Sequence, residues 1–273
     1  MKEKMILILM CIITVFIIAV ISLDCGCWTG KTAERNINGL YELIRRVQAA
    51  NAECVLLIDP GHGGMDGGAS SSDGTLEKDI NLAIATHLAQ IAEQYNCSAI
   101  LTREDDEWLC RDETGSIRSR KTADLMARRE MIRKYSPDIT VSIHLNSFKE
   151  DPRVKGAQVF YPASGGAETV LQQCSELAGV MQKNLNEKLQ KDDPRTAMTR
   201  DGVFIFKEVK YPIIIIECGF MSNPDEADRL NTDRYQQELA QCIMDGIAEY
   251  TGLKKPANVE IVDSLRRQDT LTY

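Results

Sequence analysis

The sequence predicts an α/β fold: a single domain with a largely parallel central sheet flanked by helices, preceded by one N-terminal transmembrane helix. Apolar runs typical of buried strands alternate with stretches in which apolar residues recur at helical spacing. Polar side chains capable of chemistry directly follow three of these apolar runs. The uncharged run Met5–Leu23 stands ahead of all of them. At 273 residues, of which 44% are hydrophobic, the chain can bury one large core.

The N-terminal run is the first element. Met5–Leu23 carries no charge and is long enough to span a bilayer. Lys2 and Lys4 precede it, which predicts that the N-terminus stays in the cytoplasm. No small-residue cleavage site follows, so we interpret the run as an uncleaved membrane anchor in preference to a cleaved signal segment. Both interpretations place the rest of the chain outside the cytoplasm, membrane-anchored or exported.

The pattern divides the chain into four segments. We expect the anchor or signal segment at 1–23, a polar connector at 24–52, a folded domain at 53–252 and a C-terminal tail at 253–273. Apolar residues recur at helical spacing between Ile37 and Val47, which predicts a short helix in the connector. The net charge is −8 and no basic stripe is present, so we expect no nucleic-acid partner. The nine cysteines cannot all pair with one another, and those in apolar runs are expected to be buried.

In the first half of the domain, strands and helices are expected to alternate. An unbroken apolar run predicts a strand at Cys54–Asp59, and apolar residues three to four positions apart predict a helix at Leu76–Tyr95. A short apolar run predicts a strand at Ser98–Thr102. The same two patterns predict a helix at Ala123–Lys134 and a strand at Ile139–His144.

The second half continues the alternation. Short runs rich in β-branched or aromatic residues predict strands at Ala157–Tyr161, Val203–Phe206 and Ile213–Glu217. Helical spacing predicts a long helix at Ala167–Gln190 and helix, in one or two pieces, at Pro224–Tyr250.

Two long polar stretches interrupt the pattern, at Arg103–Thr122 and Lys191–Gly202. Long loops in compact domains are usually functional, so we expect these to form the walls of a substrate groove. Solvated surface is the alternative.

Four side chains lie where ligand sites of α/β sheets gather. His62 follows the first strand by three residues in a glycine-dense loop, and His144 and Glu217 end two later strands. Glu77 opens the first helix and, at 100° per residue, is aligned with Ile84 on the core stripe, so we expect it to point inward. A buried carboxylate is costly unless it is paired or binds a metal. Two histidines and one glutamate are the ligand set of a catalytic zinc with an open fourth position.

Each of these residues also has a structural interpretation. His62 could be a turn histidine, and His144 could be a satisfied core histidine. Glu77 could be an acidic residue favoured by the helix dipole. Glu217 could form a fold-stabilising ion pair with Arg128 on the facing helix.

Four motifs occur in order: D-P-G-H-G-G, L-E-K-D, S-I-H-L-N and E-C-G-F-M-S-N-P. In these motifs the chain resembles the zinc-dependent N-acetylmuramoyl-L-alanine amidases of the amidase_3 family, over residues 55–252. The resemblance implies that 53–252 is a catalytic domain that hydrolyses the amide between N-acetylmuramic acid and L-alanine in peptidoglycan. It implies Zn²⁺ bound by His62, Glu77 and His144, with Glu217 as the catalytic carboxylate.

Three further residues flank these motifs. We expect Asp59 and Asn146 to be partners that orient the histidines, and Arg128 to lie beside the site.

The single anchor, the compact catalytic domain and the lack of wall-binding repeats resemble the germination-specific, spore-cortex subgroup. The implied role is cortex maturation with muramic lactam formation, or cell-wall remodelling. The expected partners are peptidoglycan glycan strands with stem peptides and the membrane through the N-terminal helix; an accessory protein is left open. Two alternatives are a non-catalytic peptidoglycan-binding scaffold and a zinc peptidase acting on peptide crosslinks, although H-E-x-x-H is absent.

Overall fold

The computed structural model describes residue 39 and residues 52–110 and 116–255. Nearly all of these residues belong to the compact unit Ala52–Tyr273. The predicted anchor Met5–Leu23, most of the connector and most of the tail lie outside the described residues. Within the described ranges, no helix has the length and apolar character needed to cross a membrane.

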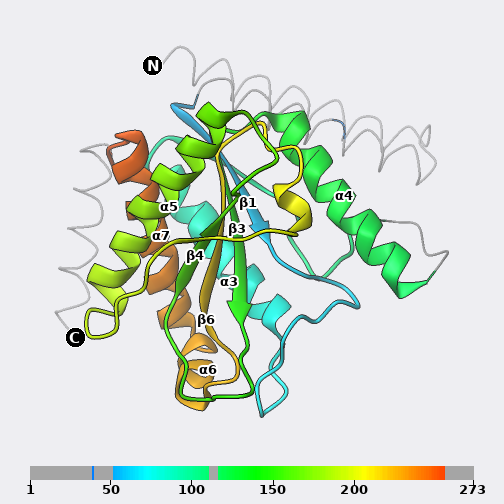
Figure 1. The fold of residues 1–273 in the computed structure, drawn as a ribbon, viewed down its shortest axis with the longest axis vertical. Helices are drawn as coiled ribbons and strands as arrows, with labels where there is room; N and C mark the ends of the chain where they lie inside the picture. The colour runs from blue at the N-terminus through cyan, green and yellow to red at the C-terminus, as the bar shows by residue number, and fades with distance from the viewer. Residues whose placement is uncertain (1–38, 40–51, 111–115, 256–273) are drawn as a thin grey trace, which may run out of the picture. The chain divides into compact units, whose positions relative to one another are not determined.

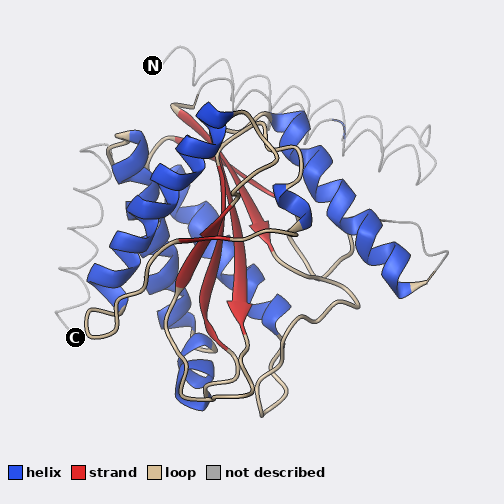
Figure 2. Ribbon diagram, viewed as in Figure 1, coloured by secondary structure: helices blue, strands red, loops and turns tan. Residues whose placement is uncertain are grey.

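A six-stranded sheet in the order β2-β1-β3-β6-β4-β5 forms the centre of the domain (Figure 2). The strands are β1 (Cys54–Pro60), β2 (Cys97–Leu101), β3 (Ile139–Asn146), β4 (Gln158–Tyr161), β5 (Met198–Thr199) and β6 (Ile213–Phe220). All neighbouring pairs are parallel except β4 and β6, which are antiparallel. The sheet is therefore mixed and mostly parallel, which confirms the predicted α/β class.

Helices cover both faces of the sheet. They are α3 (Glu77–Glu93), α4 (Ile117–Tyr135), α5 (Glu168–Leu189), α6 (Pro224–Leu230), α7 (Asp233–Thr251) and the 3₁₀ helix η1 (Phe204–Phe206). Helix α7 packs against both α3 and α5, and these three helices share the larger core. Helix α4 packs on the other face together with η1 (Figure 1). Among the described residues, the second face thus has much less helical cover than the first.

Successive side chains of the central strands point alternately into two hydrophobic cores. Leu56 and Ile58 of β1 lie in the larger core, whereas Leu57 lies in a smaller one with Ile132 of α4. Because the central strands are buried on both faces, they have unbroken apolar sequences rather than alternating ones. Burying one such side chain fully contributes about 1.5–3 kcal/mol to folding.

One predicted strand is wrong. Val203–Phe206 does not pair with the sheet, because Phe204–Phe206 forms a single 3₁₀ turn. The amide of Phe206 donates to the carbonyl of Val203 at 3.2 Å, and Ile205 and Phe206 are buried against the smaller core. A short apolar run records burial but not whether the buried segment is a strand or a turn.

Part of a predicted loop is helical. Helix α4 begins at Ile117, within the expected loop Arg103–Thr122, and the Ser116 hydroxyl caps it by accepting from the amide of Ser119. The residues that α4 buries are Asp124, Arg128 and Ile132. Since two of these three are charged, the inward stripe is not apolar, and the beginning of the helix could not be recognised from hydrophobic spacing.

Candidate active site

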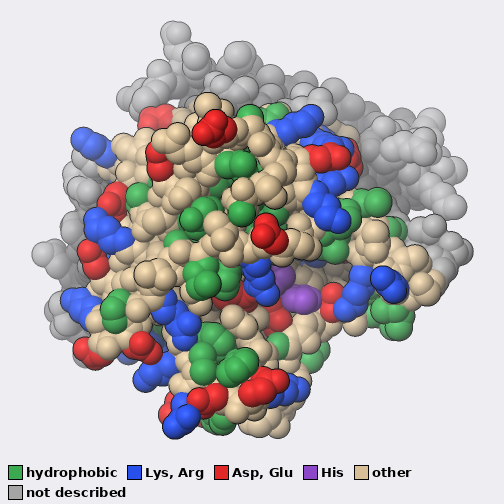
Figure 3. Space-filling view, viewed as in Figure 1, with side chains coloured by type: hydrophobic (Ala, Val, Ile, Leu, Met, Phe, Trp, Pro, Cys, Tyr) green, Lys and Arg blue, Asp and Glu red, His purple; other side chains and the backbone are tan. Residues whose placement is uncertain are grey.

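The strands β1, β3 and β6 end at a cavity of about 490 Å³ on the face that α4 covers. Asp59, Ser142, His144 and Glu217 line it, and His144 and Glu217 are neighbours in the register of β3 and β6. Histidine side chains are visible from outside among charged side chains of both signs (Figure 3). The cavity therefore lies at the carboxyl ends of parallel strands, where the sequence predicted a site.

The glycine-dense loop after β1 places His62. The amide of Gly61 donates to the carbonyl of Ile143 at 2.9 Å, which keeps the loop beside β3. A Cβ on Gly61 would lie 2.2 Å from Cε1 of His144, so only glycine leaves room for that imidazole. His62 itself has φ of 61°, a left-handed conformation that is uncommon outside glycine. Such backbone strain is concentrated at functional sites.

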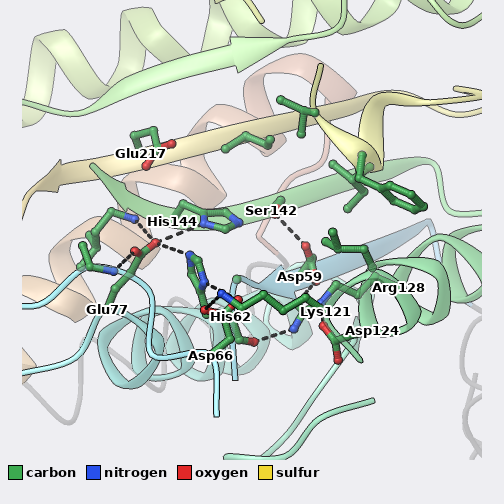
Figure 4. Close-up of a pocket in the computed structure, with 18 of the residues that line it drawn as sticks. Asp59, His62, Asp66, Glu77, Lys121, Asp124, Arg128, Ser142, His144 and Glu217 are labelled. Carbon is green, nitrogen blue, oxygen red and sulfur yellow. Dashed lines mark hydrogen bonds and ion pairs between the residues drawn. The ribbon is translucent and has the colours of Figure 1, made fainter. Parts of the chain in front are cut away.

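His62, Glu77 and His144 converge on one point. Glu77 Oε1 lies 3.2 Å from His62 Nε2 and 3.1 Å from His144 Nδ1 (Figure 4). One potential ligand atom from each residue lies within 4.8 Å of the other two. This donor set of two imidazole nitrogens and one carboxylate oxygen fits a divalent transition metal with a further position open to water or substrate.

Backbone amides fix the Glu77 carboxylate. The amides of Ala69 and Leu145 donate to its two oxygens at 2.8 and 3.0 Å. Glu77 is 3% exposed, which confirms its predicted inward position. Burial opposes its ionisation, but hydrogen bonds and charge from His144 and His62 hold the pKa of Glu77 well below its usual value. Burial also opposes protonation of His62, and hydrogen bonding and charge from Glu77, then Asp66, outweigh it and raise the pKa of His62.

Asp66 and Lys121 extend the site beyond the predicted residues. Asp66 Oδ2 lies 3.2 Å from His62 Nδ1, and Lys121 Nζ donates to Asp66 Oδ1 at 2.7 Å. A carboxylate at the second nitrogen of a metal-binding imidazole typically orients the ring. The signal in the sequence was the position of Asp66 in the same glycine-dense loop, four residues after His62.

Asp59 and Arg128 hold the backbone of the loop that carries His62. Arg128 Nη1 donates to Asp59 Oδ1 at 2.6 Å and to the carbonyl of Pro60 at 2.8 Å, and Arg128 Nη2 donates to the carbonyl of His62. Asp59 also accepts from Ser142, so its hydrogen bonds do not go to an imidazole as the sequence suggested. The pair acts on the backbone of His62 rather than on its ring.

Asn146 lines the cavity, and its Oδ1 accepts from the amide of Ser147 at 2.8 Å. No hydrogen bond joins it to either imidazole within the described structure, so the structure does not place it as a partner of the histidines.

Glu217 pairs with Arg200 and not with Arg128. Arg200 Nη1 donates to Glu217 Oε1 at 2.7 Å, whereas Arg128 is bound to Asp59 and Asp124. Glu217 is 6% exposed, and its Oε2 has no hydrogen-bond partner among the described residues. The suggested ion pair with Arg128 is therefore wrong. Arg200 lies in a predicted loop and had no distinguishing pattern of its own.

Comparisons with known proteins agree on one family. Residues 56–249 match the family described as N-acetylmuramoyl-L-alanine amidase. Over 196 residues the chain is 33% identical to the germination-specific N-acetylmuramoyl-L-alanine amidase of Bacillus subtilis strain 168, covering 72% of this chain and 79% of the relative. It is 26% identical to the amidase AmiA of Escherichia coli K12, covering 75% and 78%.

Solved structures agree. The CwlD amidase of Clostridioides difficile, determined in complex with the GerS lipoprotein, has 37% identity and a TM-score of 0.69, covering 73% of this chain and 99% of that one. The amidase AmiC2 of Nostoc punctiforme has 30% identity and a TM-score of 0.59, covering 73% and 98%. The motifs, the fold and the cavity thus have one explanation: the chain belongs to the N-acetylmuramoyl-L-alanine amidase family and is a peptidoglycan amidase.

Proposed function

We propose that the reaction is zinc-dependent, with His62, Glu77 and His144 as metal ligands and Glu217 as the general base. The observation that carries the proposal is the convergence of these three donors beside a buried carboxylate on the neighbouring strand. Separate structural roles for four such residues do not account for their meeting at one cavity.

The bond cleaved is the amide between the lactyl carbonyl of N-acetylmuramic acid and the amine of L-alanine. Zinc held by these ligands would polarise that carbonyl and lower the pKa of water. Glu217 Oε2, which no described residue occupies, takes the proton of the attacking water and gives it to the departing amine nitrogen. The products are a muramic carboxylate and a free L-alanine amine.

Metal removal tests the zinc assignment. Dialysis against a zinc chelator should abolish the release of free N-terminal L-alanine from purified peptidoglycan, and added Zn²⁺ should restore it. Product analysis also separates the alternatives, because a peptidase would break crosslinks and a scaffold would change nothing. Undiminished amine release from protein shown by elemental analysis to be zinc-free would overturn the assignment.

We further propose a role in spore cortex maturation, in which muramic residues freed of peptide become muramic lactam. The similarity to the germination-specific amidase of B. subtilis supports it. Expression of the chain in a B. subtilis strain lacking that amidase should restore muramic lactam in the cortex. A chain that is active on purified peptidoglycan but restores no lactam would argue for general wall remodelling.

Location and partner belong to the same proposal. We propose that Met5–Leu23 anchors the chain so that the catalytic domain acts outside the cytoplasm. Cell fractionation should find the full-length chain in the membrane; an exported species that begins near Asp24 would instead identify a cleaved signal. The lipoprotein bound to the C. difficile relative supports an accessory protein for this chain as well.

A further inference from the structure

Arg200 is held against Glu217 from three directions. Its amide donates to the carbonyl of Tyr161 at 3.0 Å, directly after β5. Its guanidinium lies over the ring of Phe160, 4.8 Å from the ring centroid. Its Nη1 donates to Glu217 Oε1 at 2.7 Å. The Phe160 ring and the backbone hydrogen bond to Tyr161 thus position the guanidinium independently of its contact with Glu217.

The two oxygens of Glu217 have different surroundings. Oε1 accepts the charge-assisted bond from Arg200, whereas Oε2 is buried without a described partner. Both residues line the main cavity. A carboxylate held through one oxygen presents the other in a fixed direction, because the charge-assisted hydrogen bond is the stronger kind.

Within the described ranges, Arg200 is the cation that forms an ion pair with Glu217. Its side chain is 45% exposed, so Arg200 forms part of the cavity rim rather than of the core. It also lines a neighbouring cavity of about 220 Å³ beside Gly165 and Lys207. Removal of the guanidinium should therefore free the carboxylate to rotate without opening a hole in either hydrophobic core.

We propose that Arg200 is a positioning residue for the reaction: it fixes the rotamer of Glu217 through Oε1 so that Oε2 faces the substrate's water. This inference rests on the proposed role of Glu217 as base. It differs from substrate binding by Arg200, because a residue that acts through Glu217 should change turnover and leave substrate affinity nearly constant.

A double-mutant cycle on turnover measures that dependence. On soluble glycan fragments bearing stem peptides, Arg200→Ala should lower kcat by roughly 10- to 100-fold, a part of the 10²–10⁴-fold that a general base contributes, with KM within about twofold. Arg200→Lys should recover part of the loss, because a cation remains. In a Glu217→Gln background, Arg200→Ala should cause almost no further loss, because the base on which it acts is already gone.

Chemical rescue of Arg200→Ala is a second, independent test of the positioning role. Guanidinium ion added to Arg200→Ala should restore part of kcat, whereas urea, a neutral molecule of similar shape, should not. Arg195 is the matched control, because it also lies between α5 and β6 and also lies over an aromatic ring. Its guanidinium carbon is 5.1 Å from the centroid of the Phe220 ring, and it forms no ion pair with Glu217. Arg195→Ala should retain kcat, and all variants should keep their zinc content and thermal midpoint.

The outcomes separate the two proposals. If Glu217→Gln keeps normal turnover, the proposed base is wrong. If Glu217→Gln is inactive and Arg200→Ala is unaffected, the base stands and only the positioning role fails. A raised KM with unchanged kcat would make Arg200 a substrate contact, and fully multiplicative losses would show that it acts independently of Glu217.

Discussion

Two of the proposed metal ligands have polar neighbours that hold or face them. Ala69 and Leu145 hold Glu77 through their amides, and Asp66 faces the second nitrogen of His62. Burial opposes ionisation of Asp66, but Lys121 and His62 lower its pKa, so it faces His62 as an anion. The precision of the site therefore depends on residues outside the ligand set.

Asp66→Asn should weaken zinc binding by roughly 10- to 100-fold, the range found when such outer partners are removed. The amide keeps the shape but loses the charge that orients the His62 ring. Competition with a coloured chelator measures the affinity. Asp73 is the control, because it is exposed and its side chain accepts from Ser71 and Thr75 rather than from a ligand. Equal zinc affinity for Asp66→Asn and Asp73→Asn would show that Asp66 does not orient the ligand.

At the scale of elements, the strand-to-loop transition after β1 depends on the absence of a side chain at one position. Gly61→Ala would place a methyl group 2.2 Å from the His144 ring. We expect the ring to be displaced and zinc stoichiometry to fall sharply, as measured by elemental analysis of the purified variant.

Gly179→Ala is the control for that substitution. Gly179 lies within α5, and a Cβ added there would meet no atom within 4 Å beyond its chain neighbours and its own helix backbone, so alanine should stabilise the protein by about 0.5–1 kcal/mol. Unchanged zinc content in Gly61→Ala would mean that His144 has room to bind metal in another position.

Asp59 joins four parts of the fold. It belongs to the end of β1 and accepts from Thr102 after β2, from Ser142 of β3 and from Arg128 of α4. Burial opposes its ionisation, but the charge of Arg128 and the two hydroxyls lower the pKa of Asp59 to about 2. The carboxylate therefore links the sheet to α4 on its second face.

This link predicts acid sensitivity. Because the folded pKa of Asp59 lies below its usual 3.8, the interaction stabilises the fold fully above about pH 5 and is lost as the pH falls toward 2. The shift corresponds to about 2 kcal/mol. Asp59→Asn should be destabilised by roughly 3 kcal/mol at pH 7, because Arg128 loses a buried partner.

The stability gap between Asp59→Asn and the wild type should shrink by about 2 kcal/mol between pH 5 and pH 2, as measured by urea unfolding. Asp228, an exposed carboxylate of α6, is the control, and the stability gap between its Asn variant and the wild type should stay constant with pH. A gap that stays constant with pH would show that Asp59 does not titrate in this range.

Across the molecule, the residues of the proposed site lie within one compact unit. The sheet, its helices and all proposed ligands fall between residues 52 and 255. A fragment of residues 52–255 should therefore fold cooperatively and bind one zinc ion per chain, as checked by thermal unfolding and elemental analysis. An aggregated, zinc-free fragment would show that residues outside this range are required for the fold.

From the amino-acid order alone we could predict the α/β class, the positions of most elements and four residues of the candidate site. These follow from short-range signals: unbroken apolar runs for buried strands, helical spacing for α3, and a glycine-dense loop around His62. Glu77 could be predicted to point inward because helix geometry relates it to Ile84 a few residues away.

Which charges pair with one another depends on the three-dimensional packing. Arg128 binds Asp59, which lies 69 residues away in the sequence. Glu217 binds Arg200, from which η1 separates it in the sequence. Each carboxylate has several arginines and lysines near it in sequence or on a facing element. These cations are chemically equivalent as partners, so no local sequence pattern selects among them. The choice depends on how α4 and the connection after β5 pack over the sheet. The same packing favours a 3₁₀ turn over a strand at Phe204–Phe206.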